Sequence, residues 1–227
     1  MTRNLKALGL ALVAVFAMSA MAASSASATD VFTSVNSPET ITGTSENNIF
    51  EITVGGGVAI NCTTASFHGN INNKDSQVTV TAAYNGTIGV KPHTTHCGSD
   101  LGTLDINMNG CAYWLTGETT GEDPKGGGKK DATVWVECNP STNEIIIKAT
   151  ELGVTLKVPA QTPTEGGVVY TNEAGGKVKV TATATGITWT CEPKLACNLG
   201  LGGTEGNNAD YRGDVEVHGA NGKIEVS

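Results

Sequence analysis

The stretch "LDINMNGCAYWL" (104–115) sets the expected fold. Apolar and polar residues alternate on both sides of the Asn109-Gly110 pair, which is typical of two half-buried β-strands. An Asn-Gly pair between alternating segments is the strongest short signal for a two-residue hairpin turn. We therefore expect the two flanking segments to pair with each other, with Ile106 opposite Tyr113.

A third strand is expected at "VWVEC" (134–138), where the alternation ends in Cys138. A disulfide between Cys111 and Cys138 on antiparallel strands would set Trp114 opposite Trp135, on the face away from the core. Trp114 and Trp135 are therefore the candidate ligand-binding residues. Either the pair is buried beneath another segment, or it forms an exposed aromatic platform for a sugar ring or a partner's side chain.

Alternation with a period of two recurs along most of the chain, and 29 glycines supply turns. Ile187 and Trp189 are out of phase with the preceding strand, which indicates a bulge at Gly186. Near the end, Val215 and Val217 are expected to meet a last strand at 224–226. The sequence predicts an all-β fold, an antiparallel β-sandwich tied by disulfides.

Two domain arrangements follow from the same pattern. "SQVTVTAAYNG" (76–86) resembles "GKVKVTATATG" (176–186), and Cys97 and Cys197 share the same offset, which suggests a degenerate duplication. In that case 29–140 and 141–227 form two tandem β lobes. The alternative is one continuous sandwich.

The first 28 residues are typical of a signal peptide. A short basic region is followed by the apolar segment "ALGLALVAVFA" (7–17) and by small residues that end at Ala28. We expect cleavage near Ala28 and release of the mature chain as a secreted, extracellular protein, because no later segment is apolar enough to span a membrane.

Six cysteines in an exported chain predict three disulfides. The expected pairs are Cys62–Cys97, Cys111–Cys138 and Cys191–Cys197. Because the spacing contains no C-x-x-C motif, zinc and thioredoxin-like sites are disfavoured. His93 and His96 fall on opposite faces of a strand, so no metal site and no cofactor are predicted.

A formal net charge of −8 argues against nucleic acid and anionic lipid as partners. No Gly-x-Ser-x-Gly motif is present, and nothing pairs the strand carboxylates Glu137, Glu216 and Asp105, so no catalytic residue is predicted. Arg212-Gly213-Asp214 is expected to begin a strand, not to form an adhesion loop.

The expected function is a non-catalytic extracellular module that binds a polymer, glycan or protein, or a structural surface component. One alternative is a secreted glycosidase-like hydrolase with an unseen carboxylate pair. Another is a protease inhibitor that presents Lys194 from the cysteine-closed loop "CEPKLAC" (191–197).

The segments "CTTASFHG", "NGCAYWL", "VPAQ" and "YRGDVEV" occur in an order that resembles uncharacterised secreted proteins of soil actinobacteria. The likeness covers most of the mature chain. It implies a cysteine-containing all-β fold, and because that family has no assigned activity, no functional residue is carried over. The family pattern has a further cysteine just before "PAQ", where this chain reads "ELGVTLKVPAQ".

Overall fold

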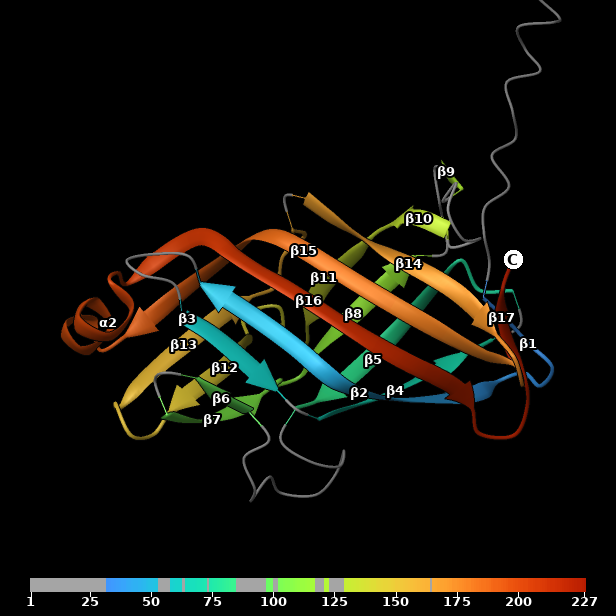
Figure 1. The fold of residues 1–227 in the computed structure, drawn as a ribbon, viewed down its shortest axis with the longest axis horizontal. Helices are drawn as coiled ribbons and strands as arrows, with labels where there is room; N and C mark the ends of the chain where they lie inside the picture. The colour runs from blue at the N-terminus through green and yellow to red at the C-terminus, as the bar shows by residue number, and fades with distance from the viewer. Residues whose placement is uncertain are drawn as a thin grey trace, which may run out of the picture.

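The computed structural model describes residues 32–227 apart from 53–57, 63, 73, 85–96, 100–101, 117–120, 123–128 and 164. The expected signal peptide and the pair His93 and His96 lie outside the described residues. Figure 1 shows an elongated molecule in which long strands cross the front and shorter strands lie behind them.

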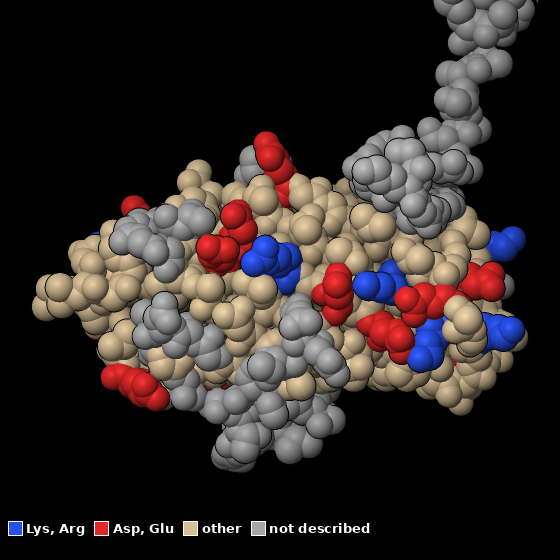
Figure 2. Space-filling model, in the orientation of Figure 1, with Lys and Arg blue, Asp and Glu red and all other residues tan. Residues whose placement is uncertain are grey.

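Four long antiparallel strands form the front layer, in the order β14 (Glu165–Glu173), β15 (Lys177–Glu192), β16 (Glu205–Gly219) and β2 (Glu39–Ile52). Their side chains alternate between core and solvent, as in β15, where Val178 and Val180 are buried and Lys179 is exposed. Figure 2 shows acidic and basic residues interspersed on the outer face of this layer. Two ion pairs cross it, Lys177–Glu216 and Lys179–Asp214.

Shorter strands continue the sheet from both halves of β2. The first half of β2 leads through β4 (Ala65–Ile71), β5 (Gln77–Ala83) and β8 (Cys111–Thr116) to β11 (Val134–Cys138). The second half leads through β3 (Val58–Cys62), β6 (Cys97–Ser99), β7 (Gly102–Asn107) and β12 (Glu144–Ala149) to β13 (Val154–Pro159). Since β13 pairs with β15, and β16 pairs with both β15 and β2, this second path closes on itself.

Two smaller pairs of strands make up the rest of those in the described residues. The strands β9 (Gly121–Glu122) and β10 (Lys129–Ala132) extend the sheet beyond β14. The strands β1 (Phe32–Ser34) and β17 (Ile224–Val226) form a separate two-stranded sheet.

The all-β antiparallel fold is confirmed, and strands from 29–140 and 141–227 share one sheet. The strand β2 pairs with β16, and β7 pairs with β12. The two similar sequence segments form β5 and β15, but Cys97 lies on a strand whereas Cys197 lies on a helix. The shared cysteine offset therefore does not correspond to a shared structural position.

All three expected disulfides are confirmed: Cys62–Cys97, Cys111–Cys138 and Cys191–Cys197. All six cysteines are buried. The expected bulge at Gly186 is also confirmed, since the register of β15 against β16 shifts between Ala184 and Ile187. Gly186 has φ 69°, a left-handed conformation that glycine adopts without steric cost.

The turn at Asn109-Gly110 forms, but the hairpin predicted around it is wrong. Both residues have positive φ, 49° and 78°, and the Cys111 N–H donates to the Met108 carbonyl at 2.8 Å. Beyond the turn, however, β7 and β8 diverge: Ile106 lies opposite Ile147, whereas Tyr113 lies between Val80 and Val136. Each strand pairs with other neighbours, so the turn lies at a corner between two parts of the sheet.

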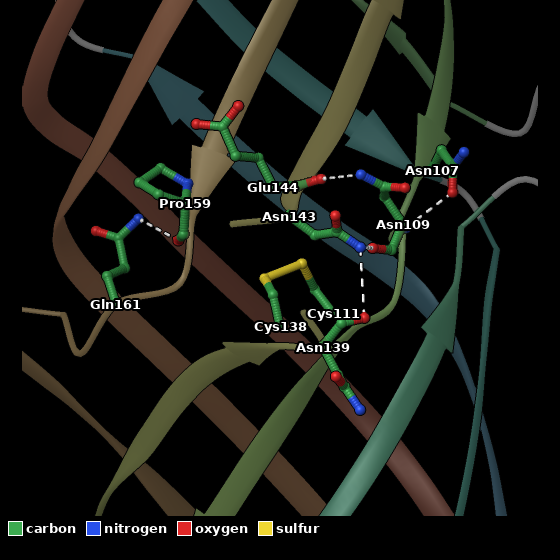
Figure 3. The surroundings of a disulfide bond; sticks show 9 residues. All are labelled: Asn107, Asn109, Cys111, Cys138, Asn139, Asn143, Glu144, Pro159 and Gln161. Carbon is green, nitrogen blue, oxygen red and sulfur yellow. Dashed lines mark hydrogen bonds between the residues drawn. A yellow bond between two sulfur atoms is a disulfide. The ribbon is translucent and has the colours of Figure 1, made fainter. Parts of the chain in front are cut away.

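A second turn at 139–143 fits against this corner (Figure 3). The Asn143 amide donates to the carbonyls of Asn109 at 2.7 Å and Asn139 at 3.4 Å, and the Asn109 amide donates to the Glu144 carbonyl at 3.3 Å. The Cys111–Cys138 disulfide lies directly beside these bonds. The two turns therefore divert β7 with β12 one way and β8 with β11 the other.

The expected pairing of Val215 and Val217 with the last strand is also wrong, because β17 pairs with β1. The chain after β16 crosses the end of β2, where the fully buried Glu39 carboxylate accepts from the Asn221 N–H at 2.6 Å and from the Asn36 amide at 3.1 Å. These bonds direct the last residues away from β16 and towards β1.

A short helix, α2 (Lys194–Leu201), begins inside the predicted cysteine-closed loop and continues past Cys197. Its inner face buries Cys197 and Leu201, while Leu195 and Leu199 are 75% and 81% exposed. Lys194 therefore lies in the first turn of a helix, not in the extended segment that a protease-inhibitor loop would need.

Candidate functional site

An apolar cavity, partly open to the surface, lies between the two layers of strands, with a volume of about 130 Å³. Strands from both paths of the sheet and from the front layer contribute to its wall. The aliphatic and aromatic wall residues include Phe50, Ile60, Phe67, Val80, Ile106, Leu115, Val134, Val136, Ile145, Ile147, Val158, Val180, Ala182, Ile187 and Val215. The polar wall residues include Asn48, Tyr84, Tyr113, Gln161 and Tyr211.

Most of the partly buried apolar side chains that pack against the core belong to this cavity wall. Phe50, Ile106, Leu115 and Val136 are examples, and each keeps some accessible surface although it points inward. Much of the residual accessible area of these core side chains therefore lies around the cavity.

The side chains that line an unfilled space of this size lack packing partners on one side. An engineered cavity of about 150 Å³ lined by aliphatic and aromatic side chains stays dry and binds benzene. The cavity in this protein therefore has the size and lining to hold one small ring compound.

Three tyrosines bring the polar groups of the wall together. The hydroxyls of Tyr84, after β5, and Tyr113, on β8, are 2.7 Å apart, and Tyr211 on β16 donates to Asn48 Oδ1 at 2.9 Å. The ring of Tyr113 stacks on that of Tyr211, with centroids 6.4 Å apart. Asn48 in turn donates from Nδ2 to Ser45 Oγ at 3.0 Å. We call Tyr84, Tyr113 and Tyr211 the tyrosine cluster.

Gly213 makes room for this cluster. A Cβ at position 213 would lie 2.5 Å from Tyr211 Oη and 2.7 Å from Asn48 Oδ1. Real Cβ atoms essentially never approach another heavy atom this closely. The residue lies in the interior of β16, so the expectation that it begins a strand is wrong. Its lack of a side chain is what allows Tyr211 and Asn48 to meet.

Burial holds the phenols neutral. Desolvation raises the pKa of Tyr113 to about 12 and raises the pKa of Tyr84 and Tyr211 above the ordinary value. For Tyr84, interactions with the hydroxyls of Tyr113 and Tyr211 raise the pKa further. At neutral pH the cluster therefore offers hydroxyl groups and no charge to the cavity.

The predicted tryptophan pair has the expected register. Trp114 lies opposite Trp135, and the two rings stack with centroids 5.8 Å apart and planes 18° apart. Both residues are half-buried. Trp114 points away from Tyr113 and Leu115, which line the cavity, whereas Trp135 also borders it.

The sequence placed Tyr113 in the core but did not indicate the tyrosine cluster. Tyr84 follows β5 and Tyr211 lies on β16, and the sequence segments that contain them, "SQVTVTAAYNG" and "YRGDVEV", carry no signal that the three tyrosines meet. The only available signal was a tyrosine at an inward position of an alternating strand, which leaves its hydroxyl in need of a partner.

The other polar candidates do not converge. Glu137, Glu216 and Asp105 lie on β11, β16 and β7, which are not neighbours in the sheet. Among the described residues, no three His, Cys, Asp or Glu side chains are grouped as a metal site. No helix in the described part of the chain is long and apolar enough to cross a membrane.

No protein-family model matches the chain, and neither a curated protein nor a solved structure does.

Proposed function

We propose that this chain is an exported, non-catalytic binding protein that holds a small, mainly apolar molecule in its interior cavity. The observation that carries the proposal is the cavity of about 130 Å³ with an almost wholly apolar wall. A stable fold gains nothing from leaving such a space empty, whereas a binding protein needs a preformed pocket of this kind.

The composition of the wall supports binding without turnover. Among the described lining residues there is no Asp, Glu, His, Lys or Arg, and the one cysteine, Cys62, is held in a disulfide. Of the side chains that serve in general acid–base or nucleophilic chemistry, the described wall also has three tyrosines, and burial raises their pKa values so that they stay protonated. Export is supported by the three buried disulfides, which persist in oxidising compartments, together with the signal-like N-terminus.

Polymer binding at the surface is a second candidate, favoured by the incomplete burial of the stacked Trp114 and Trp135. Stacking on each other already occupies one face of each ring, which reduces the area left for a sugar. Loss of polymer binding in Trp114→Ala, with small-molecule binding retained, would support this second site.

The test of the proposed function is titration of the folded protein with toluene, followed by calorimetry and thermal unfolding. We expect binding and a rise in Tm, because a ligand that binds only the native state stabilises it. Ala182→Leu adds a side chain to the cavity wall from β15 and should abolish binding.

The matched control is Thr183→Leu, which adds a similar bulk at the exposed neighbouring position of the same strand. This variant should bind toluene as the wild type does. Absence of toluene binding by the wild-type protein would contradict the proposed function.

A further inference from the structure

The strand β11 borders the cavity at an edge of the sheet. One side of β11 pairs with β8 along its whole length, from Val134 to Cys138. On the other side, Val136 exchanges two backbone hydrogen bonds with Gln161, at 2.9 and 3.0 Å. Val134, Trp135 and Val136 all line the cavity, and all three are only partly buried. At this edge the segment 160–163 therefore closes the wall in place of a strand.

The sequence "PAQTP" (159–163) explains why this segment does not continue as a strand. Proline has no backbone N–H and is rarely found inside a sheet. Pro159 is the last residue of β13, and Pro163 comes two residues after Gln161. The bridge to Val136 therefore lies between two prolines, which interrupt backbone pairing on both sides of it.

The side chain of Gln161 makes a second connection, to β15. It reaches Thr188, which lies between the residues where β15 pairs with β14, up to Thr185, and those where it pairs with β13, from Thr190. The Thr188 N–H donates to Gln161 Oε1 at 2.7 Å, and Gln161 Nε2 donates to the Thr188 carbonyl at 2.9 Å. Nε2 also donates to the Pro159 carbonyl at 3.2 Å (Figure 3). A side-chain amide thus takes the place of a strand neighbour.

Gln161 therefore fastens β11 through its backbone and β15 through its side chain. We call Gln161, with its bonds to Val136 and Thr188, the clasp. Val136 and Ile187, on the two strands that the clasp joins, both line the cavity, as Gln161 itself does. Separating two paired strands would break a row of backbone hydrogen bonds, whereas parting Gln161 from β15 breaks two hydrogen bonds of one side chain.

We propose that the clasp is the gate through which a ligand enters and leaves the cavity, with Gln161 releasing Thr188 as the ligand passes. The proposal rests on the proposed function, since it concerns access to the same cavity. A gate opens for entry as well as for exit, so loosening it speeds association and dissociation by the same factor. A residue that only contacts the bound ligand changes mainly the dissociation rate.

The first test follows the exchange of toluene between the free and bound states by NMR. Gln161→Met keeps the length of the side chain and removes both hydrogen bonds to Thr188. The matched control is Asn172→Leu, because Asn172 makes the same pair of bonds to the backbone of Val226, at 2.8 and 2.9 Å, and does not line the cavity.

We expect Gln161→Met to raise both the association and the dissociation rate constant of toluene about tenfold, because losing two hydrogen bonds favours the open clasp by about that factor. Asn172→Leu should leave both rate constants unchanged.

The second test uses the wild-type protein and asks whether the clasp opens while the protein stays folded. Hydrogen exchange of the Thr188 amide reports release of Gln161, since this N–H donates to Gln161 Oε1. The Val180 amide, between β14 and β16 in the front layer, is the reference. We expect the Thr188 amide to exchange at least about tenfold faster than the Val180 amide, through local opening.

Two results would overturn the gate while leaving the proposed function standing. One is an unchanged association rate constant in Gln161→Met, which would make Gln161 a wall contact only. The other is a Thr188 amide that exchanges as slowly as the Val180 amide, which would mean that the clasp opens only on unfolding. Failure of toluene to bind the wild-type protein would instead contradict the proposed function itself.

Discussion

Tyr113 and Trp114 are adjacent on β8, yet they belong to two aromatic clusters of different kinds. Trp114 stacks on its cross-strand neighbour Trp135 at the surface, and the pair is held by the register of two adjacent strands. Tyr113 joins Tyr84 and Tyr211 in the interior, where strands from distant parts of the sequence meet. The outer cluster thus depends on local pairing, and the inner one depends on closure of the whole sheet.

The largest expected effect concerns the inner cluster at alkaline pH. Burial raises the pKa of all four tyrosines, including Tyr170, above the ordinary value of 10.0. A raised folded-state pKa gives stability that is fully present below pH 10 and is lost as the pH rises towards and beyond 12. We expect the free energy of unfolding to fall by roughly 5 kcal/mol between pH 9 and pH 11.

Denaturant titrations at several pH values measure this loss, and the phenolate absorbance of the native protein follows ionisation directly. Phenolate should appear only as the protein unfolds. Native-state ionisation of two or more tyrosines near pH 10 would show that the cluster is not buried.

The next largest effect is the loss of stability when the Cys111–Cys138 disulfide, which joins the strands that carry Tyr113 and Trp114 to the strand of Trp135, is removed. Replacing Cys111 and Cys138 by alanine removes a bridge that spans 27 residues and should cost about 3.5 kcal/mol in the loop-entropy account. The matched control, alanine at Cys191 and Cys197, removes a bridge that spans 6 residues and should cost about 2 kcal/mol. Chemical denaturation compares the two, and an equal or reversed order would contradict the account.

A smaller effect separates the tyrosine cluster from an ordinary buried hydroxyl. Tyr84→Phe leaves the ring packed against Phe67 but removes the hydroxyl that lies 2.7 Å from that of Tyr113, and it leaves the Tyr113 hydroxyl without this partner, which should cost about 1–2 kcal/mol. Tyr170→Phe removes one hydrogen bond, to the Thr116 carbonyl, and should cost less. If Tyr84→Phe were no more destabilising than Tyr170→Phe, the hydroxyls of the tyrosine cluster would stabilise the fold no more than one ordinary buried hydrogen bond does.

The smallest effect belongs to the outer pair. A double-mutant cycle on Trp114→Leu and Trp135→Leu should give a coupling free energy of about 0.5–1 kcal/mol, the usual range for stacked aromatic pairs. Urea denaturation of the four proteins measures it. A coupling near zero would mean that the two indoles contact each other without stabilising the fold.

The same contrast explains how much could be predicted from the sequence. The strands, the three disulfides and the Trp114–Trp135 register follow from alternation and cysteine placement, which are local signals. The divergence of β7 from β8 could not be predicted, because an Asn-Gly pair specifies the turn but not which strands lie beside it.

The candidate site was missed for a related reason. The wall of the cavity combines residues from β2 to β16, and no segment of the sequence contains more than a few of them. Alternation identifies inward-facing side chains, but whether they fill the interior depends on the distance between the layers, which is a property of the closed sheet. The helix α2 was missed because its eight residues include glycine and a disulfide-bonded cysteine, and lack a capping side chain.

The most direct test of the central claim, that this fold keeps a ligand-sized apolar space, is diffraction from crystals pressurised with xenon. Xenon occupies dry apolar cavities of this size. We predict a strong anomalous peak in the cavity of the wild-type protein and no peak there in Ala182→Leu. A wild-type structure without bound xenon, in which the wall side chains meet across the space, would contradict the account.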